Sequence, residues 1–395
     1  MKNKFSNSAS WATDSLGDLC YLQAGGTPSR ANASYWEGRK IKWISAKHIA
    51  EDKIQGWEYI SKEGLENSSS KLSNPGDLIL VTRVSVGKLL FCKESFAVNQ
   101  DLTIIRSSSK INNKFLYYNL KSLLGKIISS SQGLSIKGIE RKTLEKIQIS
   151  YPRLEEQRKI VEVLETWDKA IGLTKRLIEQ KELQKKYLMQ QLLTGRTRLK
   201  GLTDPWKKIR LRNFLCEIDE RTTSNNQYPI MSVTKQGIYS QQEYFDKQIA
   251  SENNVGYKIL RRENIVFSPM NLWMGSIGFF QQDVGIVSPA YKIFNVNKTI
   301  ALFNFLRYFM TTPRMLYLYK INSEVGASIV RRNLDLAGLL SSEITLPSTK
   351  EQQAISQVLS SCDHGIDLLK QKLAKLEEQK KGLMQVLLTG KVRLK

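Results

Sequence analysis

A repeat dominates this 395-residue chain. Residues 347–395 align with residues 152–200 without a gap, at an offset of 195, and 24 of the 49 aligned positions are identical. The same offset relates Trp11, five residues before Leu16, to Trp206, five residues before Leu211. The chain is therefore one segment of about 195 residues written twice, which predicts a fold with internal pseudo-twofold symmetry.

The repeat divides the chain into four predicted domains. Residues 1–151 and 201–346 contain β-like runs, such as 77–82 and 265–268, and helical patches at 113–128 and 300–319. These two segments are expected to form mixed α/β globules. Residues 152–200 and 347–395 each open with Pro and run to a Thr-Gly pair without internal Pro, which is typical of one long helix. The predicted fold class is α+β.

A heptad pattern runs through both helical segments. With residues 157 and 352 as the first a positions, the second segment keeps an apolar a/d seam. The first fits at both ends and is polar in the middle, at Thr174, Lys181 and Lys185. Helices of about 38 residues would span roughly 57 Å, and stripes this narrow need a partner. We expect an antiparallel coiled coil between the two copies; a stalk that pairs separate chains is the open alternative.

The charge is strongly positive. Sixty Lys+Arg against 37 Asp+Glu give a net charge of +23 and a pI of about 9.7. Such an excess favours a polyanionic partner, because Lys and Arg neutralise phosphates and release counterions. A chain with internal twofold symmetry suits a twofold target, and duplex DNA is both twofold and polyanionic.

Compartment signals point to the cytoplasm. The N-terminus has no apolar region of a signal peptide, and no window is long and apolar enough to span a membrane. Cys20, Cys92, Cys216 and Cys362 are far apart, as in a protein of a reducing compartment. No membrane partner is expected.

A search for catalytic motifs finds none. The phosphate-binding loop and the dinucleotide-binding glycine motif are absent. The segment most similar to an adenine methyltransferase motif is Ser288-Pro289-Ala290-Tyr291. It has one proline and no Asn, and we interpret it as a turn that leads into a strand. His48 and His364 are the only histidines, too few for a multi-histidine metal site. We expect no catalytic residues and no metal site.

Basic and aromatic residues on loops of both globules are the candidates for DNA contact. Arg and Lys reach guanine, Asn reaches adenine, and all of them can hold phosphates, whereas Trp43 between two isoleucines is expected in the core. The candidates of the first globule are Thr27, Ser29, Arg30, Tyr35, Trp36, Arg39, Lys47, His48, Arg83, Lys88 and Lys137. Those of the second are Arg221, Lys235, Asn271, Trp273, Arg331 and Arg332.

Longer motifs point to a resemblance to one specific family. Both helical segments carry them: PRLEEQRKIVEVLETWD from Pro152, its copy from Pro347, and the ends LLTGRTRLKG and LLTGKVRL. The first globule adds Trp11 with Leu16-Gly17-Asp18, Gly25-Gly26-Thr27-Pro28, Pro75-Gly76-Asp77-Leu78-Ile79, Ala97-Val98-Asn99-Gln100-Asp101-Leu102 and Gln132-Gly133-Leu134 followed by Ile139. Over essentially its whole length the chain resembles the specificity (S) subunit of type I restriction–modification systems.

The resemblance implies that DNA recognition and catalysis are carried out by different subunits. Two target-recognition domains would each read one half of a bipartite, asymmetric DNA sequence. Two methyltransferase (M) subunits with S-adenosylmethionine and two restriction (R) translocase-nuclease subunits, which use ATP and Mg, would bind the S subunit. The chain itself would bind no cofactor and catalyse nothing. Docking of partner subunits is expected at the repeated helix ends, on Leu188, Leu192, Leu193, Leu383, Leu387 and Leu388.

The second globule departs from the family pattern. It lacks the Gly-Gly-Thr-Pro loop and has Ser288-Pro289-Ala290 where the first has Asn99-Gln100-Asp101, so the half-site it reads should differ. Two other functions stay open from the residues alone. One is a DNA methyltransferase or nuclease that acts by itself, and the other is a coiled-coil interaction protein without a role on DNA.

Overall fold

The computed structural model describes residues 11–38, 40–50, 53–131, 138–241, 253–328 and 331–394. The chain divides into two compact units. Unit 1 comprises residues 1–175 and 371–395, and unit 2 comprises residues 176–370. This division differs from the four segments of the sequence because each long helix belongs partly to both units. Each unit therefore contains one globule and a part of both helices.

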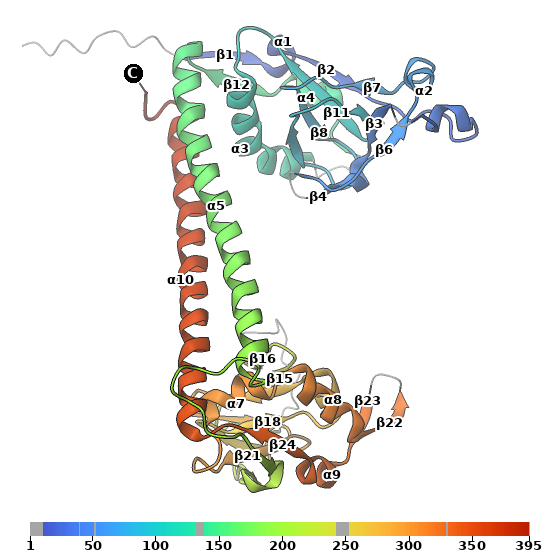
Figure 1. The fold of residues 1–395 in the computed structure, drawn as a ribbon. Helices are drawn as coiled ribbons and strands as arrows, with labels where there is room; N and C mark the ends of the chain where they lie inside the picture. Colours follow the sequence, from blue (N-terminus) through green and yellow to red (C-terminus); the bar gives the residue numbers. More distant parts are fainter. Residues whose placement is uncertain are drawn as a thin grey trace, which may run out of the picture. The chain divides into compact units, whose positions relative to one another are not determined.

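Two long helices repeat at the predicted offset. Helix α5 (Leu154–Leu192) and helix α10 (Thr349–Leu387) are each 39 residues long, and both pairs of ends differ by 195 residues (349 − 154 and 387 − 192) (Figure 1). Both are followed by a glycine with φ of +70°, at Gly195 and Gly390. Only glycine adopts this left-handed conformation without strain, so the repeated Gly ends each helix at the same point.

Ion pairs show that the helices run antiparallel. In unit 1, Lys175 lies 2.8 Å from Glu377 and Lys380 lies 2.6 Å from Asp168. In unit 2, Lys370 lies 2.8 Å from Glu182, and Lys185 pairs with Asp363. Residue numbers on α5 rise as their partners' numbers on α10 fall, so the predicted antiparallel coiled coil is confirmed.

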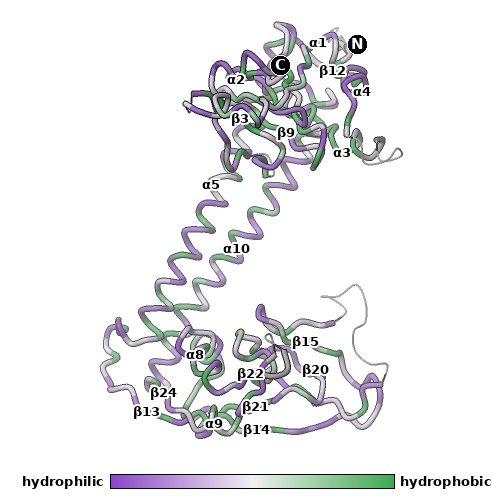
Figure 2. The backbone as a smooth tube through the Cα atoms, turned by 90° about the vertical axis from the view of Figure 1, so that its right-hand side faces the viewer, coloured by the Kyte–Doolittle hydropathy of each residue, from purple (hydrophilic) through white to green (hydrophobic). Residues whose placement is uncertain are grey.

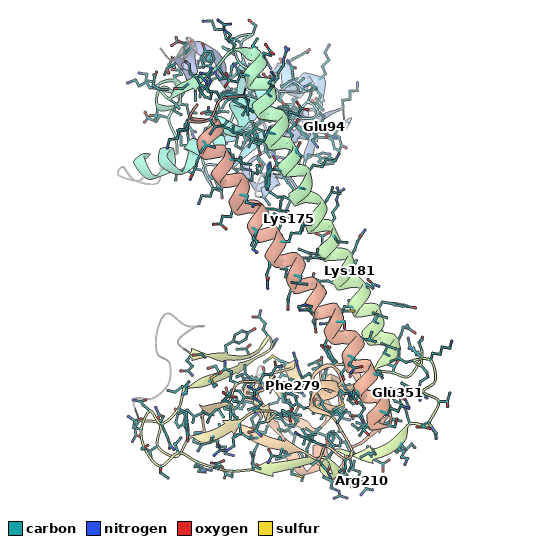
Figure 3. The ribbon with its side chains drawn as sticks, turned by 90° about the vertical axis from the view of Figure 1, so that its left-hand side faces the viewer. Glu94, Lys175, Lys181, Arg210, Phe279 and Glu351 are labelled. Atoms are coloured by element: carbon teal, nitrogen blue, oxygen red, sulfur yellow. The ribbon has the colours of Figure 1, made fainter. Side chains whose placement is uncertain are left out.

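The heptad seam is buried but not wholly apolar. Apolar and polar residues alternate along both helices (Figure 2). At the first a positions, Gln157 and Gln352 are fully buried, and their side-chain oxygens accept hydrogen bonds from the backbone of the adjoining globule. Thr174, a d position, is also buried, whereas Lys181 on α5 is exposed (Figure 3). Gln157 and Gln352 therefore attach each helix start to its globule, whereas Thr174 bonds the Ala170 carbonyl of its own helix.

In unit 1 the globule contains two four-stranded sheets, ordered β6-β3-β10-β7 and β2-β11-β8-β9, and the pairs β1-β12 and β4-β5. The strands are β1 (Ala12–Ser15), β2 (Cys20–Ala24), β3 (Ile41–Ile44), β4 (Ile49–Ala50), β5 (Lys53–Ile54), β6 (Glu58–Ile60), β7 (Lys71–Leu72), β8 (Leu78–Val81), β9 (Leu89–Phe91), β10 (Ala97–Val98), β11 (Leu102–Ser107) and β12 (Gln148–Tyr151). The helices are α1 (Leu16–Leu19), η1 (Ala33–Trp36), η2 (Ala46–His48), α2 (Lys62–Glu66), α3 (Asn113–Ser131) and α4 (Arg141–Glu145).

In unit 2 the globule has one four-stranded sheet, β14-β21-β18-β19, and the pairs β13-β24, β15-β16, β17-β20 and β22-β23. The strands are β13 (Lys207–Arg210), β14 (Leu215–Ile218), β15 (Met231–Thr234), β16 (Gly237–Ser240), β17 (Lys258–Arg261), β18 (Ile265–Phe267), β19 (Ile277–Phe279), β20 (Val284–Val287), β21 (Lys292–Val296), β22 (Ser323–Ser328), β23 (Arg331–Leu334) and β24 (Glu343–Leu346). The helices are η3 (Leu211–Asn213), η4 (Leu272–Met274), α7 (Phe303–Phe309), α8 (Pro313–Ile321) and α9 (Leu336–Ser341).

A common frame underlies both globules. The antiparallel sheet β2-β11-β8-β9 corresponds strand for strand to β14-β21-β18-β19, and the pair β1-β12 corresponds to β13-β24. In the first sheet Ile104 lies between Gln23 and Ile79; in the second, Ile293 lies between Ile218 and Val266. The other sheet, β6-β3-β10-β7, has a looser counterpart in unit 2: a parallel bridge between Ile230 and Ile286 joins the pairs β15-β16 and β17-β20 in the order β16-β15-β20-β17. The predicted strands at 77–82 and 265–268 are the inner strands β8 and β18.

One predicted helix is in fact two. The patch at 300–319 is interrupted after Phe309, and Pro313 begins a new helix there. Proline suits the first turn of a helix, where its missing N–H is not needed, and it disrupts a helix interior. The interruption lets both α7 and α8 pack buried aromatic residues into the core of unit 2, among them Phe305 and Tyr319.

Each globule core takes in the start of one long helix and the end of the other. In unit 1, Ile160 of α5 and Leu387 of α10 are buried in the same cluster. In unit 2, Leu192 of α5 and Leu359 of α10 are buried together in the equivalent way. Burying a Leu side chain contributes about 2 kcal/mol, so these residues anchor each globule on both helices.

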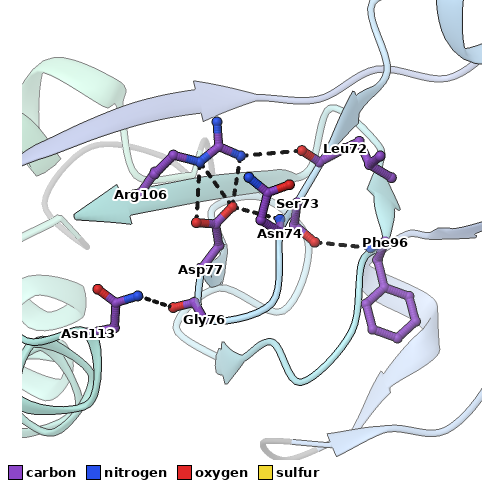
Figure 4. A network of polar contacts seen from close by, with 8 residues as sticks. All are labelled: Leu72, Ser73, Asn74, Gly76, Asp77, Phe96, Arg106 and Asn113. Atoms are coloured by element: carbon purple, nitrogen blue, oxygen red, sulfur yellow. Dashed lines mark hydrogen bonds and ion pairs between the residues drawn. The ribbon is translucent and has the colours of Figure 1, made fainter. Parts of the chain in front are cut away.

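The Pro-Gly-Asp motif of the first globule has a structural role (Figure 4). Gly76 has φ of +94°, which suits its place in the turn before β8. The carboxylate of Asp77 is nearly buried and accepts hydrogen bonds from Arg106 of β11, with Nη2 at 2.8 Å. Asp77 also accepts from the backbone N–H of Asn74, and Arg106 donates to the Leu72 carbonyl. This network ties β7 to the central strands.

Candidate nucleic-acid interface

One carboxylate gathers basic candidates of the first globule. Glu58 of β6 lies 2.7 Å from Arg30 Nη1 and 2.9 Å from Lys47 Nζ. The Nε2 atom of His48 lies 3.8 Å from the same carboxylate. The guanidinium of Arg30 stacks on Trp36, with 3.4 Å between its Cζ and the ring centroid. The structure therefore brings together Arg30, Trp36, Lys47, His48 and Glu58, which we call the Glu58 cluster.

The charges in this cluster are well defined. Hydrogen bonding by Arg30, opposed by burial and reinforced by Lys47, lowers the pKa of Glu58 from 4.5 to about 2, so Glu58 is an anion at neutral pH. Burial, followed by the charge of Lys47, lowers the pKa of His48 below 6.5, so its ring is neutral. Because Nδ1 of His48 accepts a hydrogen bond from the Ser45 N–H, the ring proton is on Nε2, facing Glu58.

Aromatic residues hold the cluster in place. The indole N–H of Trp36 donates to the Ser29 carbonyl at 3.1 Å, which fixes the loop that carries Arg30. Trp43 is buried, as the sequence predicts, and packs edge-on against Trp36 with ring centroids 5.2 Å apart. The carbonyl of Tyr35 accepts a hydrogen bond from the Ser61 N–H. Ser29 and Tyr35 thus contribute backbone atoms to the support of the cluster.

The Gly-Gly-Thr-Pro loop is pressed against the sheet. A Cβ atom on Gly25 would lie 2.0 Å from the Val98 carbonyl oxygen, and one on Gly26 would lie 1.9 Å from Ser69 Oγ. The hydroxyl of Thr27 donates to the side chain of Gln100 at 2.7 Å. The loop and the Asn-Gln-Asp turn of the same globule therefore form one joint, and only glycine fits at its two closest points.

The hairpin between β8 and β9 presents two further candidates. Lys88 donates from Nζ to the Ile49 carbonyl at 2.8 Å. The guanidinium of Arg83 is exposed and pairs with no side chain in the described part of the chain. Val84 beside it has φ of +50° and is 69% exposed. A β-branched residue in this conformation is strained, so the hairpin holds an apolar side chain outward at a cost.

Candidates of the second globule also come together. Arg332 on β23 lies over Trp273 of η4, with 5.0 Å between its Cζ and the ring centroid. Its Nη1 donates to the Ser323 carbonyl, while its Nε is buried and has no hydrogen-bond partner among the described residues. Asn271 is the residue at the N-terminus of η4. Arg332 and Trp273 therefore form a second basic and aromatic pair, and Asn271 lies two residues before Trp273.

Arg221 and Lys235 lie elsewhere. Arg221 donates two hydrogen bonds to Asp219, which also lies 3.3 Å from the buried Lys258. Lys235 lies at the turn between β15 and β16 and lines a cavity of about 460 Å³ together with Lys185 and Arg307. Arg39 and Lys137 lie outside the described residues, as does the side chain of Arg331.

Two equivalent triads, missed by the sequence reasoning, join the globules to the helices. In unit 1, Tyr118 of α3 donates to Asp168 of α5 at 2.6 Å, and Lys380 of α10 donates to the same carboxylate at 2.6 Å. In unit 2, Tyr308 donates to Asp363 at 2.7 Å and Lys185 pairs with that Asp. Burial and the neighbouring Asp raise the pKa of both tyrosines, which remain hydrogen-bond donors. In the sequence, the repeated lysines at heptad a positions, Lys185 and Lys380, were the signal that could have indicated these triads.

A second pair of contacts closes each helix end. In unit 2, Arg198 donates from Nε and Nη2 to the two oxygens of Glu351 at 2.6 and 2.7 Å. In unit 1, Arg393 holds Glu156 in the same way, with both distances 2.7 Å, and lowers the pKa of that carboxyl. The offset is again 195 residues. Each Arg follows the end of one helix and grips the first turn of the other.

The leucines expected to dock partner subunits have another role in the structure. Leu192 and Leu193 are buried in the core of unit 2, and Leu387 and Leu388 are buried in the core of unit 1. Leu188 and Leu383 keep partial exposure. The LLTG motif thus packs each helix end into its own globule, which leaves most of its leucine surface unavailable to another protein.

The described residues also bear on metal sites and membrane spans. Among these residues, no group of three or more His, Cys, Asp or Glu side chains has the arrangement of a metal site. Helices long and apolar enough to cross a membrane are likewise not found there.

Comparison with known families agrees with the repeat. Residues 9–183 and 204–378 both match the type I restriction modification DNA specificity domain, and these matches are offset by 195 residues (204 − 9 and 378 − 183). Together they cover most of the chain.

Whole-length relatives and solved structures are similar as well. The type I restriction enzyme MjaVIII specificity subunit of Methanocaldococcus jannaschii is 24% identical over 91% of this chain and 93% of its own. The Escherichia coli EcoR124I/EcoR124II specificity subunit is 32% identical, over only 40% of each chain. A chain from a structure of type I R-M system assembly has a TM-score of 0.62 at 16% identity, covering 97% of this chain and 99% of that one. The S subunit of M. genitalium has a TM-score of 0.54 at 14% identity, covering 98% of both. The chain belongs to the type I restriction–modification DNA specificity family and is a non-catalytic specificity subunit with two copies of the family domain.

Proposed function

We propose that this specificity subunit recognises a bipartite, asymmetric sequence of duplex DNA, one half with each globule. Residues 1–151 and 201–346 are the proposed reading domains, and residues 152–200 and 347–395 are the scaffold between them. The observation that supports the proposal is that the two globules share a repeated frame but carry different groups of basic and aromatic side chains. The frame sheets and helix junctions correspond in both units, whereas the Glu58 cluster and the Arg332–Trp273 pair differ in their residues and elements.

The candidate residues divide by what they can do on DNA. Arginine stacked on an aromatic ring, as at Arg30 and Arg332, is held in a plane suited to guanine or to a phosphate. Asn271 is of the type that pairs with adenine, and exposed lysines such as Lys47 and Lys235 suit phosphates. Thr27, Tyr35 and Lys88 are tied to their own globule, so we propose a positioning role for them.

The proposed scaffold sets the separation of the half-sites. A 39-residue helix spans about 58 Å at 1.5 Å per residue. Reading successive major grooves on one face of DNA requires centres roughly 34 Å apart or a multiple of this. An antiparallel pair anchored in a globule core at each end is long enough for this purpose.

The proposed partners are two methyltransferase subunits and the translocase-nuclease subunits. S-adenosylmethionine, ATP and Mg would be bound by those partners, and work on the chromosome implies a cytoplasmic location. Two identical partners need two equivalent surfaces. Besides the partly exposed Leu188 and Leu383, the helices carry Leu173 and Leu368, which are related by 195 residues and are each 51% exposed. We propose these leucines as docking residues.

Methyl transfer tests the proposal. The purified chain, alone and with its methyltransferase subunit, would be incubated with duplex DNA and radiolabelled S-adenosylmethionine. Label should enter DNA only when both proteins are present, and only in DNA that contains the recognised site. Methylation by this chain alone, or identical methylation by the partner alone, would contradict the proposal. Binding of the chain to random-sequence duplex should weaken steeply as salt rises.

A further inference from the structure

The Glu58 cluster has the composition of a phosphate site with an anion already in it. Arg30 and Lys47 carry two positive charges, His48 offers a neutral N–H, and the group they surround is a carboxylate. Guanidinium and ammonium groups bind carboxylates and phosphates through the same hydrogen-bond donors. Glu58 therefore occupies the position where an incoming phosphate oxygen would satisfy the same three side chains.

The cations are accessible and their present partner is imperfectly bound. The side chains of Arg30 and Lys47 are 54% and 67% exposed, whereas that of Glu58 is 29% exposed. The Oε1 atom of Glu58 is enclosed and accepts no hydrogen bond of good geometry among the described residues, although Lys47 Nζ is 2.9 Å away. A ligand that approached from solvent would meet the two cations first and could satisfy them better than Glu58 does.

We propose that Arg30, Lys47 and His48 form a phosphate-binding site of the first globule, which Glu58 occupies in the DNA-free protein. Glu58 thereby lowers the affinity for DNA of arbitrary sequence, because each non-specific encounter must displace it. A sequence-specific complex also makes base contacts, and their binding free energy offsets the cost of displacing Glu58. This inference rests on the proposed DNA-binding function and assigns Glu58 the role of a specificity residue that works by competition.

The second globule provides an internal comparison. The guanidinium of Arg332 also lies over a tryptophan, but no carboxylate pairs with it in the described part of that globule. In the described part of unit 2, the Arg332–Trp273 pair therefore lacks the carboxylate that holds Arg30 in the first globule. Removal of a carboxylate elsewhere should therefore not reproduce the effect of removing Glu58. Glu94, which lies 2.6 Å from Lys42 in the same globule, is the matched control.

The test measures binding to a random-sequence duplex by fluorescence anisotropy across a series of salt concentrations. We expect Glu58→Gln to bind about 3- to 10-fold more tightly at low salt, with a steeper salt dependence, since about one more phosphate can be neutralised. Glu94→Gln should bind as the wild type does. Adding Arg30→Gln to Glu58→Gln should remove most of the gain. Glu58→Asp keeps the charge on a shorter side chain and should show a smaller gain.

The outcomes separate the inference from the function on which it rests. If the wild type does not bind duplex DNA in a salt-dependent way, the proposed function fails, and the inference with it. If the wild type binds but neither Glu58→Gln nor Glu58→Asp binds more tightly, only the inference is overturned. A gain that persists after the Arg30 change, or an equal gain with Glu94→Gln, also overturns it.

Discussion

Single carboxylates organise several clusters and junctions of this protein. Glu58 gathers basic side chains of the first globule, while Asp168, Asp363, Glu156 and Glu351 fasten globules and helices. In a chain of net charge +23, each acidic residue placed among cations has a large local effect. Under the proposed function, the acidic residues would determine which of the many cations are available to DNA.

The Glu58 cluster should make stability depend on pH at the acid end. The pKa of Glu58 is depressed to about 2 in the folded chain, against 4.5 ordinarily. A depressed pKa means that the ionised form stabilises the fold, so this contribution is complete above about pH 4.5 and is lost as the pH falls through about 2. Urea unfolding of the wild type and of Glu58→Gln should differ by a constant amount above pH 5 and converge below pH 3. A difference that grows as the pH falls would contradict this.

The two helix-end arginines should differ in importance. Glu351 is almost fully buried, whereas its counterpart Glu156 has a side chain that is 12% exposed. Arg198→Ala leaves Glu351 with Trp206 as its remaining side-chain donor, which should cost about 3 kcal/mol. Arg393→Ala should cost clearly less, because its partner can be hydrated. The free energy of unfolding from denaturant titration measures both; equal losses would speak against burial as the deciding factor.

For individual residues, the sequence identified the right residue types but not which side chains contact one another. Arg30, Trp36, Lys47 and His48 were candidates on charge and aromaticity alone, and they do meet. Glu58 was not a candidate, because an isolated Glu between Trp57 and Tyr59 gives no sign that three basic side chains converge on it. Side-chain convergence depends on how β3, β6 and η2 pack, which no local pattern encodes.

Among the elements, the long helices were the most predictable. Proline before the start, glycine after the end and a heptad repeat define α5 and α10 almost to the residue. The Tyr–Asp–Lys triads were not predicted. Their Asp and Lys obey the 195-residue offset, but Tyr118 and Tyr308 are 190 residues apart, inside globules whose repeat is hidden in the sequence. Only the folded α3 and α7 reveal the correspondence.

The triads should stabilise the globule–helix junctions. Tyr118→Phe and Tyr308→Phe each remove one part-buried hydrogen bond to a carboxylate without changing the ring, at an expected cost of about 1–2 kcal/mol. Tyr187→Phe, on an exposed part of α5, should cost almost nothing. Thermal unfolding of the three variants makes the comparison. If Tyr187→Phe lowered the midpoint as much as the other two changes, the triads would not be the cause.

Exposed leucines on the helices should determine partner stoichiometry. Leu173→Asp and Leu368→Asp each alter one of two equivalent positions, so each variant should retain one methyltransferase subunit, and the double variant none. Leu183 is the control: it is 67% exposed, but its counterpart 195 residues on is Glu378, so it cannot belong to a repeated surface. Analytical ultracentrifugation of the complexes reports the stoichiometry. Loss of both subunits from a single variant would argue against two equivalent sites.

In the molecule as a whole, some features of the two copies of the repeat correspond and others differ. The strand pairing, the helix bounds, the triads and the Arg–Glu contacts at the helix ends recur, whereas the Glu58 cluster and the Arg332–Trp273 pair differ in their residues and elements. Under the proposed function, a symmetric frame would give two identical partners equivalent positions. Different side chains on that frame would give each globule its own reading surface, so that one chain could recognise an asymmetric sequence.

Methylome sequencing of the host tests this account most directly. Three strains would be compared: the intact strain, one in which the gene is deleted, and the deletion strain complemented with an Arg30→Ala, Trp36→Ala variant. We predict a methyladenine motif of two specific parts around an unread spacer, which disappears on deletion. The variant should relax base preference in one part only and leave the other unchanged. A motif that survives deletion, a motif without a spacer, or a variant that alters both parts equally would contradict the account.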